Sequence, residues 1–361
     1  MGLKKIINKT ITPIMMKLGA SSLWYSSLKK RFFYKKYSLE MDELIAKYIS
    51  YPITNKQRRY LKKDYLHFLW KYGGSIETDY FKTQMYRKSD FTRMESLANE
   101  SRYAWRDSFQ AKKYWPIFKD KRKFYESFSD ELGRLWMIVD KDSKKEDFLK
   151  FIKKCDYNVF VKDPYGYGGS SVKFYKNLTI EESLKLFEEL RMKDYSYIVE
   201  EQLKQCEELL SFSNCSVNTL RIITLVNTKG NPYVGYALLR MGSGKSDVDN
   251  FSSGGMAALV DVDTGILCTT AMNGKGEEFV FHPVTGKQIV GFKIPDWEKY
   301  KTFAIKLASY YPEMRYIGWD IIKDSNNNMC VIEGNKDAGV DLNECRLLYG
   351  LKPVYERILN L

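Results

Sequence analysis

The sequence has little of what histidine-based and thiol-based enzymes use. Only two histidines, His67 and His282, occur in 361 residues, so His-rich zinc sites and most histidine-based catalytic arrangements are not expected. The six cysteines form no Cys-x-x-Cys pair and no metal-ligand spacing, which in a chain of this length indicates reduced thiols of a cytosolic protein. These absences favour a chemistry that needs neither a histidine nor a thiolate nucleophile.

Long apolar runs are also missing. No stretch approaches the roughly 20 apolar residues that a transmembrane helix needs. The first 28 residues open with basic side chains, but Lys9 and Lys17 interrupt their apolar stretches, so this segment is a poor signal peptide. It is compatible with an amphipathic helix that packs on its own domain or lies on a membrane surface. We expect a cytoplasmic protein, and peripheral contact with the inner face of the membrane stays open.

The charge balance is basic. The chain has 58 Lys and Arg against 45 Asp and Glu, a net charge of +13, and the excess lies towards the N-terminus. Such a region attracts RNA, anionic lipid or an anionic substrate through the same long-range field. A solvated basic surface explains the pattern as well, and no nucleic-acid partner is expected. A homodimer stays open.

The sequence pattern changes near Pro116. Before it, aromatic and aliphatic residues recur at three-to-four spacing among basic residues, which indicates helices. After it, strand-like runs alternate with helical segments. We expect an α+β fold with a helical basic region over 1–115, a first lobe over 116–200 and a second lobe over 201–361.

Several elements of the two lobes can be predicted individually. Thr179 and Glu182 form a capping box that predicts a helix over 180–191. Long helical patterns also cover 297–310 and 352–359. Strands are predicted at 136–139, 158–161, 197–199, 221–226, 234–240 and 257–262, and a β-hairpin joins 317–322 to 329–333.

A glycine-rich loop follows Lys162. Residues 163–171 contain three glycines and two serines between two predicted strands. Backbone N–H groups of such a loop can bind phosphate oxygens, with serine hydroxyls and the lysine charge assisting. Neither a Walker A motif nor a Gly-x-Gly-x-x-Gly motif is present. A purely structural turn explains the same residues, so this loop alone does not identify a phosphate site.

A second polar cluster lies on the predicted C-terminal hairpin. Asp320 lies in its first strand, and Glu333 and Asn335 lie at the end of the second. An acid within a buried strand is costly unless something neutralises it. Two carboxylates and an amide oxygen are hard donors that suit Mg²⁺. The alternative is a pair of acids bound to neighbouring lysines or arginines.

The order of these motifs resembles the ATP-grasp superfamily. A lysine at 121–123, Lys162 with its glycine-rich loop, a strand ending in Glu200-Glu201, and Asp320 followed by Glu-x-Asn occur in the order typical of it. More narrowly, the chain resembles the sugar-transfer-associated ATP-grasp proteins, whose genes lie among those of polysaccharide biosynthesis enzymes. The resemblance covers about residues 120–361, with further matches at 218–221, 249–255, 282–286 and 294–297.

The resemblance implies roles for individual residues. Lys162 and either Lys121 or Lys123 would bind phosphates; Gly168, Gly169, Ser170 and Ser171 would cover them; Glu200, Glu201 and Leu203 would contact adenine; Glu207 or Glu208 would bind the ribose; and Asp320, Glu333 and Asn335 would hold Mg²⁺. The cofactors implied are ATP and Mg²⁺.

A substrate loop is implied at residues 250–255. Asn250 begins a segment that resembles the Asn-x-x-x-Gly-Gly loop of glutamate-adding ligases in the superfamily. The arginine that those ligases carry two places earlier is replaced by Val248. Arg221 or Arg240 is the candidate for that charge and for stabilising an acylphosphate and a tetrahedral oxyanion. The catalytic candidates are therefore Arg221, Arg240 and Asn250.

The resemblance implies an ADP-forming ligase. A carboxylate would receive the γ-phosphoryl group of ATP, and an amine would then attack the acylphosphate. The substrates expected are an amino acid or other acid and an amino sugar or glycan precursor of a surface polysaccharide such as a capsule. Two alternatives stay open: an ATP-grasp phosphotransferase that acts on a hydroxyl, and a non-catalytic nucleotide-binding or partner-docking protein.

Overall fold

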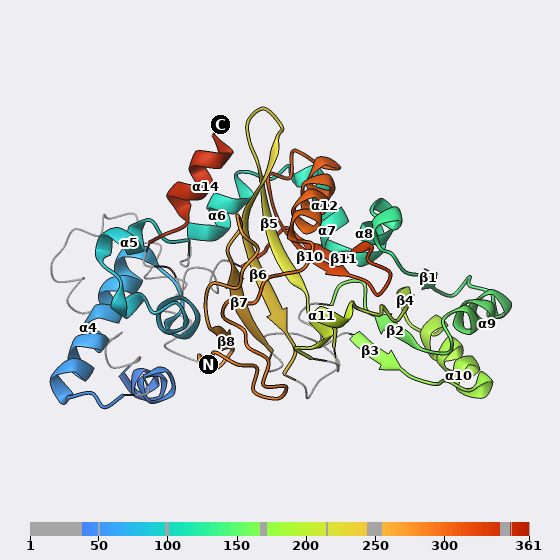
Figure 1. Ribbon diagram of the computed structural model, residues 1–361, viewed down its shortest axis with the longest axis horizontal. Coiled ribbons are helices and arrows are strands. Elements are labelled where there is room, and N and C mark those ends of the chain that lie inside the picture. The colour runs from blue at the N-terminus through green and yellow to red at the C-terminus, as the bar shows by residue number, and fades with distance from the viewer. Residues whose placement is uncertain are drawn as a thin grey trace, which may run out of the picture. The chain divides into compact units, whose positions relative to one another are not determined.

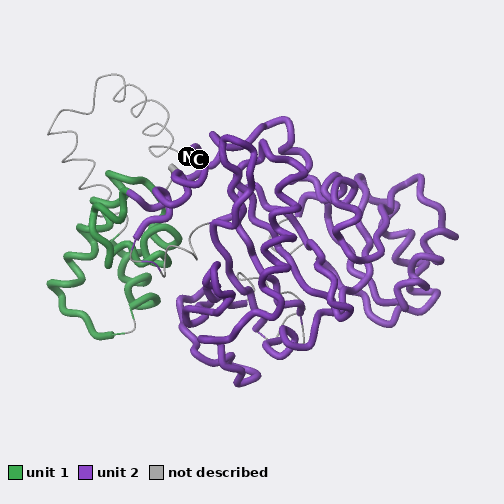
Figure 2. Tube along the Cα trace, turned by 45° about the horizontal axis from the view of Figure 1, so that its top comes forward, with its two compact units in different colours: residues 1–94, 98–101 green, residues 95–97, 102–361 purple. Residues whose placement is uncertain are grey.

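The computed structural model describes residues 38–49, 51–97, 101–166, 172–213, 216–243, 255–339, 347 and 349–360. The chain divides into two compact units, residues 1–94 with 98–101 and residues 95–97 with 102–361 (Figure 2). None of the described helices is both long enough and apolar enough to cross a membrane.

The first unit is helical, as predicted for the N-terminal region. Its described elements are a helix over residues 38–48, α4 (Asn55–Tyr72), the π-helical segment η2 (Ile76–Lys82), the short turn η3 (Met85–Arg87) and α5 (Asp90–Met94). Helix α4 begins with a capping box between Thr54 and Gln57. Its buried residues Tyr65 and Phe68 pack on Tyr80 of η2, with ring centroids 5.2 and 5.5 Å apart. Aromatic packing therefore forms the core of this unit.

The second unit contains a small antiparallel sheet. Its strands lie in the order β1 (Trp136–Val139), β4 (Tyr197–Glu201), β2 (Val159–Lys162) and β3 (Val172–Tyr175). Helices α9 (Lys145–Lys154) and α10 (Ile180–Arg191) pack on it through Phe148 and Phe187. Helix α10 begins where the capping box of Thr179 and Glu182 predicts.

A larger antiparallel sheet forms the centre of the same unit (Figure 1). Its strand order is β11 (Met329–Asn335), β10 (Tyr316–Lys323), β5 (Leu220–Val226), β6 (Pro232–Met241), β7 (Met256–Val260), β8 (Ala271–Asn273) and β9 (Glu278–Phe279). The predicted strands and the predicted hairpin are confirmed, with ends that differ by a few residues.

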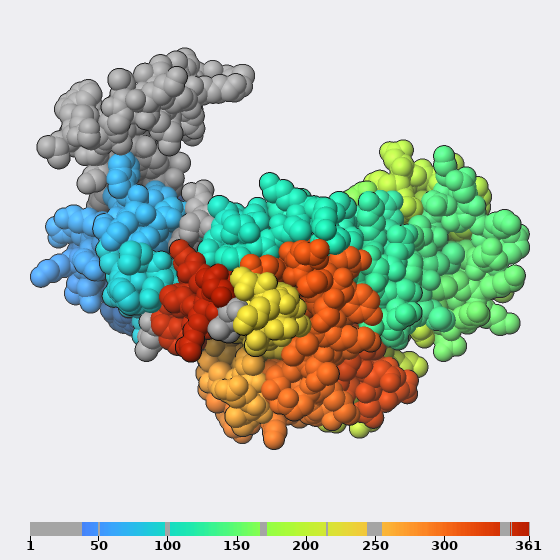
Figure 3. All heavy atoms as spheres, turned by 90° about the horizontal axis from the view of Figure 1, so that it is seen from above, coloured from blue at the N-terminus to red at the C-terminus, as the bar shows by residue number. Residues whose placement is uncertain are grey.

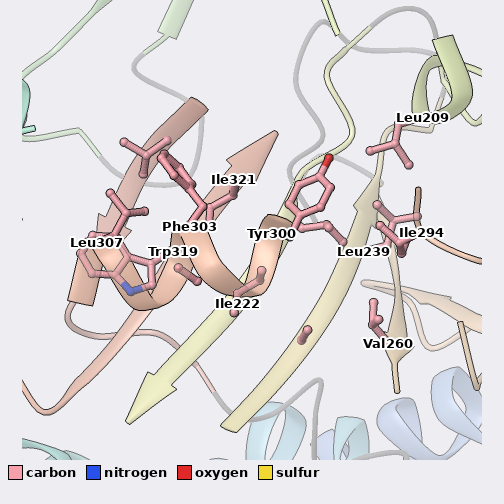
Figure 4. Close-up of a cluster of buried hydrophobic side chains, with 14 of the residues drawn as sticks. Leu209, Ile222, Leu239, Val260, Ile294, Tyr300, Phe303, Leu307, Trp319 and Ile321 are labelled. Carbon is pink, nitrogen blue, oxygen red and sulfur yellow. The ribbon is translucent and has the colours of Figure 1, made fainter. Parts of the chain in front are cut away.

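Helices cover both faces of the large sheet. Helix α12 (Trp297–Ser309) places Tyr300, Phe303 and Leu307 on one face, against a core that includes Trp319 (Figure 4). Helix α14 (Lys352–Leu359) places Tyr355 in the separate core of the other face. Both helices were predicted from the sequence, and together with the sheets they confirm the α+β class.

Short helices precede the small sheet along the chain, and one more lies between the two sheets. They are α6 (Ser101–Asp107), α7 (Trp115–Lys119), α8 (Lys121–Ser127) and α11 (Glu207–Leu210), with 3₁₀ turns η4 (Lys112–Tyr114) and η5 (Ser129–Glu131). Phe118 and Phe124 pack around Gly334, where a Cβ atom would lie 2.8 Å from the Phe124 ring. In Figure 3 the turquoise segment that contains α7 lies beside the orange segment that contains α12. The boundary between the two units thus lies near residue 101, and residues 102–115 pack with the second unit.

The chain enters the small sheet by passing over β11. Gly133 adopts a φ of +62°, and a Cβ atom there would clash with the Sγ atom of Cys330. The chain leaves the small sheet beside the end of β10, because the Ser325 N–H donates to the Lys204 carbonyl over 2.8 Å. Both connections therefore fix the small sheet against the β10–β11 hairpin.

We expect Gly133→Ala to lower the free energy of unfolding by about 2–4 kcal/mol, because left-handed strain adds to a steric clash. Urea denaturation measures this value. Gly230→Ala is the control, since Gly230 also has a positive φ, +82°, but no atom lies within 4 Å of the position that its Cβ atom would take. Equal losses for the two variants would contradict the close approach to Cys330.

Candidate functional site

A buried charge cluster lies where β2 and β4 meet. The Nζ atom of Lys162 lies 2.5 Å from Oε1 of Glu200 and 3.0 Å from the hydroxyl of Tyr125. The guanidinium of Arg134 donates to Oε2 of Glu200 over 2.7 Å, and the Tyr125 hydroxyl donates to the same oxygen. All four side chains are buried. The cluster thus holds the predicted phosphate-binding lysine in a defined position.

Electrostatics keep this cluster ionised. Burial opposes the charged form of Glu200, but Arg134 and Lys162 outweigh it and lower the pKa of Glu200 to about 2. Burial likewise opposes the charge of Lys162, and the Glu200 carboxylate outweighs it and raises the pKa of Lys162. Two cations and one anion leave a net positive charge, which suits a phosphate ligand.

Tyr125 and Arg134 were not predicted from the sequence as site residues. Tyr125 lies in α8 and Arg134 precedes β1, so they are 75 and 66 residues from Glu200. No local pattern marks either residue, because the contact depends on how α8 and the small sheet pack.

Of the two candidate lysines in α8, Lys121 faces the site. Asp120 caps the helix, and the Lys121 ammonium donates to the carbonyl of Gly166, in the loop that follows β2. Burial lowers the pKa of Lys121, and the charge of Glu333 opposes that shift. Lys123 is exposed. Lys121 therefore lies within electrostatic reach of the metal candidate Glu333.

The predicted metal ligands lie together on the β10–β11 hairpin. Asp320 pairs with Glu333 across the two strands, and Gly318 pairs with Asn335. The Asn335 amide donates to Oε1 of Glu333 over 3.0 Å. Two carboxylates and an amide thus converge on one face of the hairpin. Their oxygen atoms fit Mg²⁺, which prefers carboxylate and carbonyl ligands.

Two arginines also bind Asp320. Arg221 lies opposite Asp320 on β5, and its Nη2 donates to Oδ2 over 2.8 Å; Nη1 of Arg240 donates to the same oxygen over 2.9 Å. Burial opposes ionisation of Asp320, but the charges of Arg221 and Arg240 outweigh it and lower the pKa of Asp320. Asp320 is therefore bound to neighbouring arginines, as the alternative to a metal site predicts, and it also lies on the strand that pairs with Glu333 and Asn335. The catalytic candidates Arg221 and Arg240 therefore contact the metal-ligand candidate Asp320.

The predicted adenine and ribose contacts lie at the end of β4 and in the residues that follow it. The Glu201 carboxylate accepts a hydrogen bond from the Leu135 N–H over 3.1 Å, and Leu203 is half-buried. Glu207 is exposed at the start of α11, whereas Glu208 lies 3.7 Å from Lys323. Glu200 differs from these residues because its carboxylate belongs to the charge cluster.

Some predicted residues lie outside the described residues. They are Gly168, Gly169, Ser170 and Ser171 of the glycine-rich loop and Asn250 of the substrate loop. The described neighbours are Gly166 and Val172 for the first loop and Ser243 and Gly255 for the second. The roles of the five residues stay predictions.

The family is decided by a match over most of the second unit. Residues 101–359 match the family of sugar-transfer associated ATP-grasp proteins. The chain belongs to this family. The match covers more than half of the chain and confirms both the family resemblance and the ATP-grasp fold predicted from the motif order. No curated protein gives a significant match.

Solved structures give distant similarities. The D-alanine-D-alanine ligase from Coxiella burnetii is 12% identical, with a TM-score of 0.36, over 61% of this chain and 48% of that one. The ATP-grasp ligase PsnB, solved with a precursor peptide and AMPPNP, is 14% identical with a TM-score of 0.40, over 71% of this chain and 64% of that one. The N5-carboxyaminoimidazole synthetase from Staphylococcus aureus, solved with ADP, is 13% identical with a TM-score of 0.38, over 62% and 46%. The chain thus spans about half to two thirds of these proteins.

Proposed function

We propose that this ATP-grasp protein is an ADP-forming carboxylate–amine ligase that acts through an acylphosphate. The observation that carries the proposal is the convergence of three groups of side chains in one unit. Lys162 and Lys121 supply positive charge, Asp320 and Glu333 supply carboxylates for a metal, and Arg221 contacts Asp320 directly. Phosphoryl transfer needs positioning and charge stabilisation rather than a nucleophilic side chain.

Each group has a role in binding. Lys162 and Lys121 would bind phosphate oxygens of ATP, and the backbone beyond β4 would contact the adenine edge. Asp320, Glu333 and Asn335 would hold Mg²⁺, which when bound neutralises charge on the transferring phosphoryl group. Arg221 and Arg240 would stabilise negative charge on the acceptor side.

The proposed reaction has two steps. A carboxylate oxygen of the first substrate attacks the γ-phosphorus, the bond between that phosphorus and the β–γ bridging oxygen breaks, and ADP leaves. The amine nitrogen of the second substrate then attacks the acyl carbon, inorganic phosphate leaves, and the nitrogen loses a proton. Arg221 and Arg240 would stabilise the acylphosphate and the oxyanion of the second step.

The substrate class rests on the family. The description of these proteins as sugar-transfer associated supports an amino sugar or glycan precursor as the amine, and an amino acid or other acid as its partner. The reaction would take place in the cytoplasm, where ATP is supplied. The product would enter a surface polysaccharide such as a capsule.

The experiment is ADP release from Mg-ATP with a panel of acids against amino sugars and sugar nucleotides. ADP that forms only when an acid and an amine are both present supports the ligase. ADP that forms with a hydroxylated acceptor alone would assign a phosphotransferase instead. A wild-type protein that binds no Mg-ATP would contradict an ATP-dependent enzyme of either kind.

The two lysines of α8 give a direct test of the nucleotide site. We expect Lys121→Ala to weaken Mg-ADP binding about tenfold or more, because a charge-assisted contact to phosphate is lost. Lys123→Ala is the matched control and should bind Mg-ADP as the wild type does. Isothermal titration calorimetry measures both affinities. Equal affinities for the two variants would contradict the role of Lys121.

A further inference from the structure

The guanidinium of Arg134 connects the two sheets of the second unit. Its side chain is 1% exposed. One edge donates to the Glu200 carboxylate over 2.7 Å and to the Tyr125 hydroxyl over 2.7 Å. Nη1 donates to the carbonyls of Leu132, over 2.9 Å, and Val331, over 3.0 Å. A single buried cation thus contacts β4 of the small sheet and β11 of the large sheet.

The positions of these partners relate the contact to the site. Val331 lies two residues before Glu333 on β11, and Glu200 binds Lys162 across the β2–β4 pair. The path from the metal strand to the phosphate-binding lysine therefore has two side-chain links, Arg134 and Glu200. Every polar contact along it is 3.0 Å or shorter.

Three donors occupy the Glu200 carboxylate within this path. It accepts hydrogen bonds from Arg134 and Tyr125 and forms an ion pair with Lys162. A buried carboxylate with three donors has little capacity left for an adenine edge. Glu200 therefore acts on Lys162 rather than on the base.

We propose that Arg134, with Tyr125, is a positioning residue that sets the place of Lys162 relative to the metal strand through Glu200. This proposal rests on the proposed function, because it requires Lys162 to bind nucleotide phosphates. Arginine suits the role since its planar guanidinium can donate in several fixed directions at once. A lysine would keep the charge but could not span Glu200 and the Val331 carbonyl with the same geometry.

The main test measures Mg-ADP affinity in Arg134→Lys and Tyr125→Phe. Both changes preserve the net charge of the cluster. We expect about 10- to 100-fold weaker binding for Arg134→Lys, the range that loss of charged hydrogen bonds gives, and a smaller loss for Tyr125→Phe. Arg191→Lys is the control, because Arg191 is a half-exposed arginine of α10 outside the cluster. It should bind Mg-ADP as the wild type does.

A double-mutant cycle separates positioning from general destabilisation. If Arg134 acts through Lys162, Arg134→Lys should weaken Mg-ADP binding much less in a Lys162→Met background than in the wild type. Losses that simply add would overturn the proposal. So would wild-type affinity in both Arg134→Lys and Tyr125→Phe.

Two controls keep the result interpretable. Circular dichroism and thermal unfolding identify a variant that does not fold, and the Tyr125→Phe cycle with Lys162→Met then decides the question, because Phe keeps the buried ring. A wild-type protein that fails to bind Mg-ADP refutes the proposed function. A wild type that binds Mg-ADP with additive variants refutes only the role of Arg134 and Tyr125.

Discussion

Glu200→Ala is expected to lower the free energy of unfolding by about 3–5 kcal/mol, the cost of leaving buried charges unpaired. Glu200 is 4% exposed and forms ion pairs with both Arg134 and Lys162. Removal of its carboxylate leaves two cations in the interior without their anion. Urea denaturation at neutral pH measures the loss.

The neighbouring Glu201→Ala variant is the control. Glu201 is half-buried, and its carboxylate accepts a hydrogen bond from the Leu135 N–H. Its removal should cost about 1 kcal/mol, as expected for one hydrogen bond. A Glu200→Ala variant that loses no more than this control would show that the cluster is not a structural ion network.

The same cluster predicts a pH dependence. The pKa of Glu200 falls from 4.5 to about 2 on folding: burial opposes this shift, and Arg134 and Lys162 drive it. A carboxyl whose pKa is lowered on folding stabilises the protein above its unfolded pKa and loses that effect as the pH falls towards its folded pKa. The stability difference between wild type and Glu200→Ala should therefore narrow between about pH 4.5 and 2. Unfolding curves at several acidic pH values measure the difference, and a constant one would contradict the shift.

Asp320→Asn is expected to lower ADP formation by at least about 100-fold, because it removes one anionic ligand from the proposed metal site. The change keeps the shape of the side chain but removes the charge that Arg221 and Arg240 bind. A raised Mg²⁺ concentration should restore part of the activity if the loss arises from metal binding. Steady-state rates across a Mg²⁺ titration measure both effects.

Asp324→Asn is the matched control on the same hairpin. Asp324 accepts hydrogen bonds from the Asn326 and Asn328 N–H groups in the turn, away from the proposed ligands. This variant should keep its activity and its Mg²⁺ dependence. Equal losses in Asp320→Asn and Asp324→Asn, with no response to Mg²⁺, would point to a structural defect of the hairpin.

Much of the fold follows from local sequence. The capping box at Thr179 defines the start of α10, and two apolar runs joined by an Asn-rich turn indicate the hairpin that pairs Asp320 with Glu333. These features depend on residues close in the chain, where propensity and hydrogen bonding act directly. The same logic predicted that Asp320, Glu333 and Asn335 lie near one another, and the strand pairing agrees, while their role as metal ligands stays a prediction.

The rest of the site depends on packing between distant segments. Whether Lys121 or Lys123 faces the site is set by the rotation of α8 on the large sheet, which no local pattern defines. Arg134 and Tyr125 bind Glu200 across 66 and 75 residues, and single residues in loops and helices carry no periodic signal. The unit boundary near residue 101 likewise follows from contacts made by α6 and α7 with the second unit.

Isotope transfer tests whether this protein is a carboxylate–amine ligase that forms an acylphosphate intermediate. The acid substrate found in the ADP-release panel is labelled with ¹⁸O in its carboxylate and incubated with Mg-ATP and the amine. If the acylphosphate forms, the inorganic phosphate released carries one ¹⁸O atom, because the bridging oxygen of the acylphosphate leaves with phosphorus. Inorganic phosphate without ¹⁸O, or a phosphorylated product without free phosphate, would contradict it.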